Sequence, residues 1–391
     1  MKYNFDKVID RSGTSAEKVE GLKHIWGRTD LIPLWVADMD FATAPFVTDA
    51  IRKRCENEVL GYTGKPDSYY NAIINWVKQR YDLVVAKEMI NFVPGIVPGI
   101  GMAMNCFTQK GDKVMIQPPV YHPFAWVTTR NERTLVTNPL KWENGMYRMD
   151  LDTFREQIKG CKLFILCNPH NPGGVVWTEA ELRAIADICY DEKVLVFSDE
   201  IHADLTLPPH THRPFATVSE KARMNSVTFM SPSKAFNMPG LSASHALIFN
   251  EDLRKRFRIY MDAGELDMGH VFAFLSVEAA YSHGTEWLDQ CLAYIQGNID
   301  FVDDFLKNHA PKIKAIRPEA SYLVWLDCRE LKLSQKDLNE FFVDKAHLAL
   351  NDGEMFGKEG IGFMRLNVAS PRCIIEKAMK QLADAYQLYI K

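Results

Sequence analysis

Short apolar runs alternate with helical patterns between about residues 90 and 250. The runs are rich in β-branched and large apolar residues, as buried strands are, and they are DKVMIQ (112–117), KLFILCN (162–168), KVLVFSD (193–199), SVTFMS (226–231) and HALIFN (245–250). Between two of them, TEAELRAIADICYDE (178–192) has helical periodicity, and Thr178 with Glu181 has the pattern of a capping box. Near-continuous apolar strands separated by helices predict an α/β fold with a mainly parallel sheet between helices.

The pattern changes after about residue 285. A long helical stretch, TEWLDQCLAYIQGNIDFVDDFLKNH (285–309), is followed by short strands such as SYLVWLD (321–327) and GFMRLNV (362–368). This mixture predicts a smaller α+β domain formed by residues 286–391, and we expect residues 1–50 to join it. Residues 51–285 would then form the large domain.

Composition excludes several classes of protein. The 391 residues are 47% hydrophobic and 25% charged, as in an ordinary globular protein, and the net charge of −4 gives no reason to expect nucleic acid or an anionic membrane as a partner. No apolar segment approaches the roughly 20 residues of a membrane span, and the first residues lack the apolar core of a signal peptide. The 8 cysteines include no CxxC pair, which favours reduced thiols and a cytoplasmic protein.

Polar residues gather where the predicted strands end. Each has an ordinary explanation by itself, such as a turn, a helix cap, a packed aromatic ring or a solvated lysine. In a parallel sheet, however, ligands bind beyond the carboxyl ends of the strands, so we interpret these residues together as one site. They are Tyr121, Asn171, Asp199, His202, Ser231, Ser233 and Lys234.

One ligand, pyridoxal 5'-phosphate, uses all of these groups. It needs a lysine amine that bonds covalently to it, which Lys234 supplies, and an acid that keeps its pyridine nitrogen protonated, for which Asp199 is suited. Asn171 and His202 can bind the phenolate oxygen, and Tyr121 can stack on the ring. We therefore predict pyridoxal 5'-phosphate as the cofactor.

The cofactor's phosphate requires an anion site. In VPGIVPGIG (93–101), glycines allow backbone N–H groups to approach an anion, and Pro98 is well placed to start a helix whose N-terminus faces it. Hydroxyl groups after the strand at 226–231 add further donors. The predicted contacts are Gly95, Ile96, Val97, Ser231 and Ser233.

Three motifs carry a family resemblance. NPHNPGG (168–174), SDEIHAD (198–204) and SPSKAFN (231–237) resemble the fold-type I pyridoxal-phosphate enzymes, the aspartate aminotransferase superfamily, and the likeness extends over nearly the whole chain. Further motifs are most similar to the cystathionine β-lyase-like C–S lyases, including the maltose-regulon modulator type. These motifs are LWVADMDF (34–41), LGYTG (60–64) and FMRLNVASPR (363–372).

The resemblance implies further roles. Arg365 would bind the substrate α-carboxylate, with Asn171 and Ala37 also contacting the substrate. Tyr62 would reach the cofactor phosphate of the neighbouring subunit, which implies a homodimer with shared active sites. Many aminotransferases have tyrosine at the place of His202 and a phosphate-binding arginine at the place of Ser242, and both departures are usual in the C–S lyase group.

The predicted function is a C–S β-lyase that eliminates thiol from sulfur amino acids such as cystathionine, giving pyruvate and ammonia. Its predicted catalytic residues are Lys234 as the general base, Asp199 and Tyr121. Two alternatives stay open: an aminotransferase that uses the same residues, and a cofactor-binding regulator that acts by protein contact. No metal is assigned, because the histidines of PPHTH (208–212) lack Cys or carboxylate at ligand spacing and are expected to be solvated.

Overall fold

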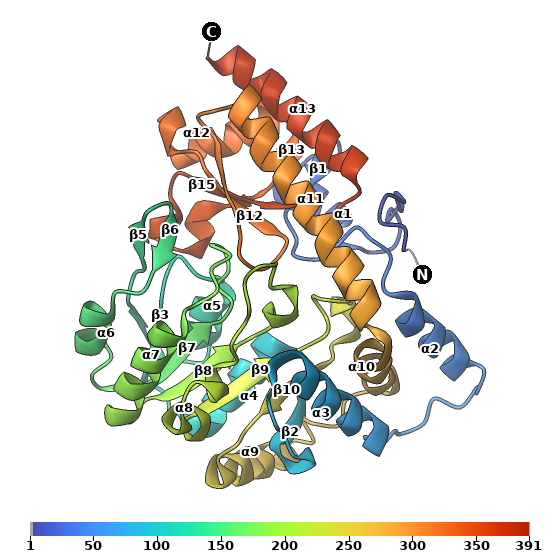
Figure 1. Cartoon of the computed structure of the whole chain (residues 1–391), viewed down its shortest axis with the longest axis vertical. Coiled ribbons are helices and arrows are strands. Elements are labelled where there is room, and N and C mark those ends of the chain that lie inside the picture. Colours follow the sequence, from blue (N-terminus) through green and yellow to red (C-terminus); the bar gives the residue numbers. More distant parts are fainter. Residues whose placement is uncertain (1–2, 391) are drawn as a thin grey trace.

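A seven-stranded sheet forms the centre of the computed structural model, which describes residues 3–390 (Figure 1). In spatial order its strands are β2 (Ile90–Val93), β10 (Ser244–Leu247), β9 (Ser226–Met230), β8 (Leu195–Asp199), β7 (Cys161–Cys167), β3 (Lys113–Ile116) and β4 (Thr134–Thr137). Only β10 is antiparallel to its neighbours in this sheet. The predicted α/β fold with a mainly parallel sheet is therefore confirmed.

Each strand predicted between residues 112 and 250 is present, within a few residues of the expected bounds. β2 and β4 were not predicted. Both are 4 residues long, as are the predicted β3 and β10, so length is not the reason. β4 has no buried residue and thus no apolar run, and β2 was not singled out although all four of its residues are buried.

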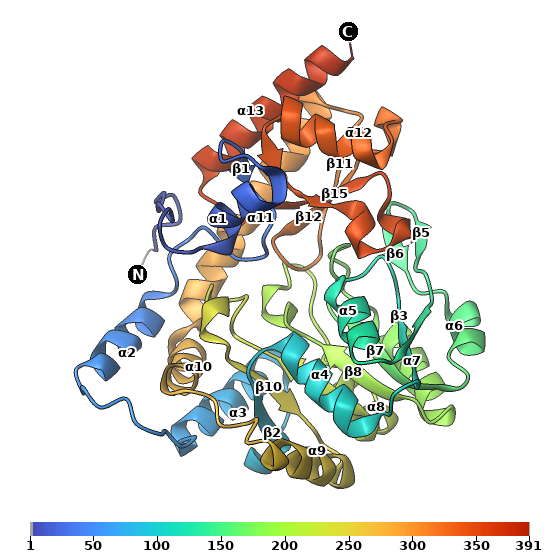
Figure 2. The ribbon, with the colours of Figure 1, turned by 180° about the vertical axis from the view of Figure 1, so that it is seen from behind.

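Helices cover both faces of this sheet (Figure 2). One face packs against α4 (Ile96–Phe107), α5 (Pro123–Arg130) and α9 (Glu251–Ala263). The other face packs against α3 (Asp67–Tyr81), α7 (Glu179–Asp191), α8 (Glu220–Met224) and α10 (Val271–His283). The capping box of α7 is confirmed, since the Thr178 hydroxyl accepts from the Glu181 N–H at 3.2 Å and the Glu181 carboxylate accepts from the Thr178 N–H at 2.9 Å.

A second, four-stranded antiparallel sheet lies beyond the carboxyl ends of the first. Its order is β11 (Lys314–Ile316), β12 (Leu323–Asp327), β15 (Phe363–Asn367) and β14 (Asn351–Asp352). β1 (Ile32–Pro33) pairs with β13 (Leu348–Ala349), which brings the N-terminal segment beside the C-terminal one. The predicted domain limits stay a prediction.

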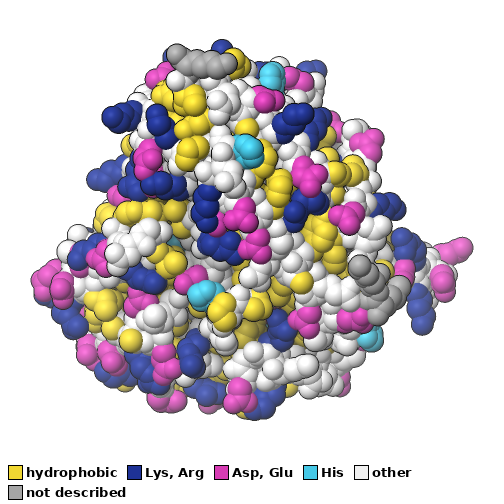
Figure 3. Space-filling view, turned by 45° about the horizontal axis from the view of Figure 1, so that its top comes forward, with side chains coloured by type: hydrophobic (Ala, Val, Ile, Leu, Met, Phe, Trp, Pro, Cys, Tyr) yellow, Lys and Arg dark blue, Asp and Glu magenta, His cyan; other side chains and the backbone are white. Residues whose placement is uncertain are grey.

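The long helix α11 (Thr285–His309) runs from α10 along the four-stranded sheet (Figure 1). The other helices and the remaining hairpin are α1 (Glu17–Trp26), α2 (Pro45–Cys55), α6 (Leu151–Gln157), α12 (Gln335–Glu340), α13 (Arg372–Tyr389), β5 (Lys141–Glu143) and β6 (Met146–Arg148). None of the helices within residues 3–390 is both long and apolar enough to span a bilayer. Figure 3 shows basic and acidic side chains interspersed over one face.

Candidate active site

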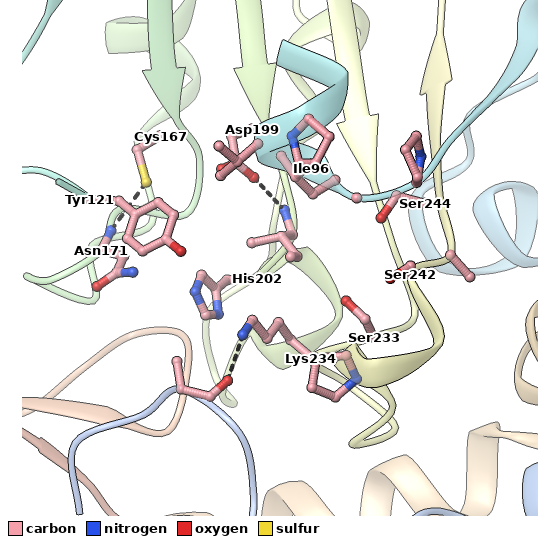
Figure 4. A pocket seen from close by; sticks show the side chains of 18 residues that line it. Ile96, Tyr121, Cys167, Asn171, Asp199, His202, Ser233, Lys234, Ser242 and Ser244 are labelled. Atoms are coloured by element: carbon pink, nitrogen blue, oxygen red, sulfur yellow. Dashed lines mark hydrogen bonds between the residues drawn. The ribbon is translucent and has the colours of Figure 1, made fainter. Parts of the chain in front are cut away.

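A cavity of about 200 Å³ lies where β7, β8 and β9 end. Figure 4 shows Asp199 and Lys234 at opposite ends of it, with Tyr121 on one side and Ser242 on the other. The structure therefore brings together most residues of the predicted site. Those that line the cavity are Ala37, Gly95, Ile96, Val97, Tyr121, Asn171, Asp199, His202, Ser233 and Lys234.

Lys234 projects into this cavity with a single hydrogen-bond partner. Its Nζ donates to the carbonyl oxygen of Ala37 at 2.6 Å. Burial lowers the pKa of the amine to about 8, and the charge of Arg365 acts in the same direction, whereas Asp38 opposes both. A substantial fraction of the amine is therefore neutral near physiological pH, as a nucleophile or base must be.

Asp199 ends β8 and is buried, with 3% of its surface exposed. Its carboxylate accepts one backbone hydrogen bond, from Ile201 N–H at 3.1 Å, and no basic side chain of residues 3–390 forms an ion pair with it. Burial raises its pKa to about 7. A buried carboxyl without a cationic partner is suited to receive a protonated ring nitrogen from a ligand.

His202 and Tyr121 are held in their neutral forms. Burial, with the nearby charges of Lys234 and Arg365, lowers the pKa of His202 to about 3, and its Nδ1 atom is buried without a partner. Burial raises the pKa of Tyr121. His202 therefore has a free position for a ligand oxygen, and Tyr121 presents an uncharged ring to the cavity.

The N-terminus of α4 forms one end of the cavity. The helix begins at Ile96, two residues earlier than the predicted start at Pro98, and Gly95 is its N-cap with φ of 147°. This value lies in a region that other residues rarely adopt, which explains the glycine. The exposed N–H groups of the first turn make this end of the cavity suitable for a phosphate.

Three serines line the cavity: Ser233, Ser242 and Ser244. Ser231 does not line it, because its hydroxyl lies 2.8 Å from the Ala243 carbonyl and 2.8 Å from the Ser233 hydroxyl. A carbonyl oxygen only accepts hydrogen bonds, so the Ser231 hydroxyl donates to Ala243 and accepts from the Ser233 hydroxyl. Direct contact of Ser231 with the phosphate stays a prediction.

Arg365, on β15, lies beside the cavity and is 3% exposed. Its guanidinium donates to the Asn171 side-chain oxygen at 3.0 Å, the Asn351 side-chain oxygen at 2.5 Å and the Trp35 carbonyl at 3.2 Å. No acidic side chain among the described residues pairs with it, and its Nε has no partner. This buried cation can bind a carboxylate of a small ligand.

Tyr62 lies apart from the cavity. It is 99% exposed, in the segment between α2 and α3, and borders a surface depression together with Leu60 and Met268. Its predicted role at the site of a neighbouring subunit stays a prediction.

Side chains of the DEIHAD segment (199–204) point in two directions. Asp199 and His202 line the cavity, whereas Glu200 points away and bonds to His212 Nε2 at 2.7 Å and to the Phe215 N–H at 2.8 Å. His212 is therefore buried, and the expectation that it is solvated is wrong. The pairing of Glu200 with His212 depends on how the loop after β8 folds, and no local pattern indicates it.

The residues present fit pyridoxal 5'-phosphate. The decisive observation is that one cavity holds a partly neutral lysine amine, an unpaired buried carboxyl and a helix N-terminus with hydroxyl groups. These match the aldehyde, the pyridine nitrogen and the phosphate of the cofactor, respectively.

Comparison with known proteins identifies the family. The family model for class I and II aminotransferases matches residues 29–382. The chain belongs to this family. The cystathionine β-lyase PatB of Bacillus subtilis (strain 168) is 38% identical over 384 residues, covering 98% of this chain and 99% of PatB. Protein MalY of Escherichia coli (strain K12) is 31% identical, covering 98% of each chain.

A solved structure agrees with the fold. Cystalysin from Treponema denticola, which contains a pyridoxal 5'-phosphate cofactor, superposes with a TM-score of 0.96 at 34% identity, covering 100% of both chains. Both the predicted fold and the predicted resemblance to C–S lyases are confirmed.

Proposed function

We propose that this chain is a pyridoxal 5'-phosphate-dependent C–S β-lyase, which converts a sulfur amino acid and water into a thiol, pyruvate and ammonia. The observation that carries the proposal is that Lys234 and Asp199 line one cavity and Arg365 bonds to its lining residue Asn171, while none of the three forms an ion pair within residues 3–390. Relatives named as cystathionine β-lyases, similar over almost their full length, support the reaction type.

When bound, the cofactor supplies an electron sink that stabilises negative charge at the substrate α-carbon. Asp199 holds a proton at the pyridine nitrogen, which keeps the sink effective. Asn171 and His202 bind the phenolate oxygen, and Tyr121 stacks on the ring. The N–H groups of Gly95, Ile96 and Val97 and nearby serine hydroxyl groups hold the phosphate.

Arg365 binds the substrate α-carboxylate, which orients the α-proton and the β-sulfur. Lys234 in its neutral form removes the α-proton, and a thiolate then leaves the β-carbon. The pKa of about 8 suits this role, because an ordinary lysine would be almost fully protonated at neutral pH.

The active unit is a homodimer in which Tyr62 of one subunit contacts the cofactor phosphate of the other. The support is that this large aromatic residue is 99% exposed and lies outside the cavity of its own chain. We also place the enzyme in the cytoplasm, since its eight cysteines are all unpaired.

Partition of products tests the proposal. Purified enzyme given cystathionine or cystine should release pyruvate together with a thiol or persulfide, without any added keto acid. Given alanine or aspartate with 2-oxoglutarate, it should form glutamate much more slowly. A faster reaction that depends on keto acid would identify an aminotransferase, and no turnover with either set would favour a regulator.

A further inference from the structure

Residues 35–41, which we call the strap, pass the mouth of the cavity and are bound by side chains from both ends of the site. The Trp35 carbonyl accepts from Arg365, and the Ala37 carbonyl accepts from Lys234. The strap thus joins the arginine for the substrate carboxylate to the lysine for the cofactor. Neither contact explains what holds the backbone of the strap in place.

Asn367 holds the middle of the strap. Its Nδ2 donates to the carbonyls of Val36 and Asp38, both at 2.7 Å, and its side-chain oxygen accepts from the Ala369 N–H at 2.8 Å. Asn367 is 1% exposed and lies two residues after Arg365 on β15, so both side chains project from the same face of the strand. The Ala37 peptide is therefore fixed on both sides.

Asn237 holds the far end of the strap in the same manner. Its Nδ2 donates to the Met39 carbonyl at 3.0 Å and the Phe41 carbonyl at 2.7 Å, and its side-chain oxygen accepts from the Met39 N–H at 3.0 Å. It lies three residues after Lys234, in a left-handed conformation with φ of 52°. Asn237 thus links the chain segment of Lys234 to the strap that contains its acceptor, the Ala37 carbonyl.

The Ala37 carbonyl is a two-donor acceptor. Lys234 donates at 2.6 Å, and the hydroxyl of the fully buried Tyr322 donates at 2.9 Å. The Lys234 amine would not be available to the Ala37 carbonyl while it is bonded to a cofactor, so this carbonyl would bind the amine only in its free form. A fixed acceptor then decides where the free amine is held.

We propose that Asn367 and Asn237 are positioning residues, which fix the strap so that the Ala37 carbonyl oxygen holds the Lys234 amine whenever it is not bonded to the cofactor. This inference rests on the proposed function, in which that free amine is the base. Neither asparagine touches the cavity, so they act through the backbone of the strap.

The test measures the amine directly in the cofactor-free protein. Trace acetic anhydride labels neutral amines, and mass spectrometry of the Lys234 peptide over a range of pH gives the midpoint of its protonation. Asp38, Asp199 and Arg365 also act on this midpoint. Asp38 belongs to the strap and moves with it, so the change in its distance to the amine is part of the expected shift, whereas Asp199 and Arg365 lie outside the strap. In Asn367→Ala and Asn237→Ala the midpoint should fall by about one pH unit, because the ammonium form loses its aligned acceptor.

Asn298 provides a matched control. It is also fully buried, and its Nδ2 donates to two carbonyls, those of Val368 and Ser370, both at 2.9 Å. Asn298→Ala should lower the melting temperature about as much as Asn367→Ala but leave the Lys234 midpoint unchanged. If Asn367→Ala does not fold, Asn367→Ser, which keeps a donor for one carbonyl, should show about half the shift.

An unchanged midpoint in the folded variants of both positions, or an equal shift in Asn298→Ala, would overturn the proposal. The loaded enzyme adds a second measurement: kcat should fall roughly tenfold in the strap variants, with KM and cofactor affinity within about twofold of the wild type. Absence of lyase activity in the wild type would refute the proposed function, whereas the labelling result would still decide the role of the strap.

Discussion

Buried charges are paired in one region of the molecule and unpaired in another. The paired region is a cluster of Arg11, Lys18, Asp38 and Asp40, and the unpaired one is the cavity. In the cluster, Lys18 is fully buried but lies 2.9 Å from Asp40 and 3.6 Å from Asp38, and Arg11 bonds to the same two carboxylates at 3.2 Å and 2.6 Å. In and beside the cavity, Lys234, Asp199 and Arg365 form no ion pair with any other described residue. A buried charge costs several kcal/mol unless it is paired, so the first arrangement stabilises the fold and the second is completed only by ligands.

The largest effect is expected at Lys234. Lys234→Ala removes both the attachment point and the base, so β-elimination should fall by about 10³-fold or more. Borohydride reduction of the wild-type enzyme, followed by peptide mapping, should place the pyridoxyl group on Lys234. Label on another lysine would refute the assignment of the whole site.

Replacing Asp199 should separate catalysis from cofactor binding. Asp199→Asn keeps the shape of the carboxyl but cannot hold a proton at the ring nitrogen, so turnover should fall by about 10²-fold while the cofactor still binds. Absorbance of the bound cofactor and the rate of pyruvate release measure the two effects. Turnover close to that of the wild type would show that Asp199 only caps the turn after β8.

Asp199 should also make the stability of the cofactor-free protein depend on pH. The folded pKa of Asp199, about 7, lies above the unfolded value near 3.8, so the folded state binds more protons between these values. Cofactor-free wild type should therefore lose stability relative to Asp199→Asn as the pH rises from about 4 to 7. Thermal unfolding of both proteins at several pH values measures the difference, and parallel curves would contradict it.

A substitution in the paired cluster should affect stability more than activity. Lys18→Met leaves Asp40 without its nearest cation, although Arg11 still contacts both carboxylates, so unfolding should become easier by about 2 kcal/mol. At temperatures where the variant is folded, kcat/KM should fall less than in Asn367→Ala, because Arg11 still holds Asp38 and Asp40 of the strap. A loss of activity as large as that of Asp199→Asn would mean that the two regions are not distinct.

Tyr62 should have the smallest effect, and only across the subunit interface. Tyr62→Phe removes one hydrogen bond to the phosphate, so cofactor affinity should fall about tenfold. Where Lys234→Ala and Tyr62→Phe each lack activity under limiting cofactor, mixing them should restore some, since one site of a heterodimer then has both groups. Failure of mixed dimers to recover would exclude a shared site.

The predicted site residues lie together in the structure wherever they follow parallel strands. Asn171, Asp199 and Lys234 each come after such a strand, and the carboxyl ends of these strands meet. Ser244 was missed as a cavity residue and Ser242 was noted only as a replacement for arginine. β10 is antiparallel, so its beginning, and not its end, lies at the cavity. Strand direction cannot be read from an apolar run.

Other features depend on contacts between distant segments. The strap is bound by asparagines that lie some 200 and 330 positions away in the chain, and even the bond between His212 and Glu200 joins residues 12 positions apart. No local period encodes such pairs. The fold class therefore emerged from local patterns, whereas the supporting structure of the site did not.

The contact between Arg365 and Trp35 spans 330 positions, and this has a consequence for biosynthesis. A nascent chain that has left the ribosome as far as residue 250 already contains the lysine, the acid and the phosphate loop. It lacks Arg365, the proposed binding group for the substrate carboxylate, and Asn367, which binds the strap. On the proposed roles, cofactor binding can therefore begin during translation, but turnover requires that residues 365 and 367 have been made and have folded against the strap.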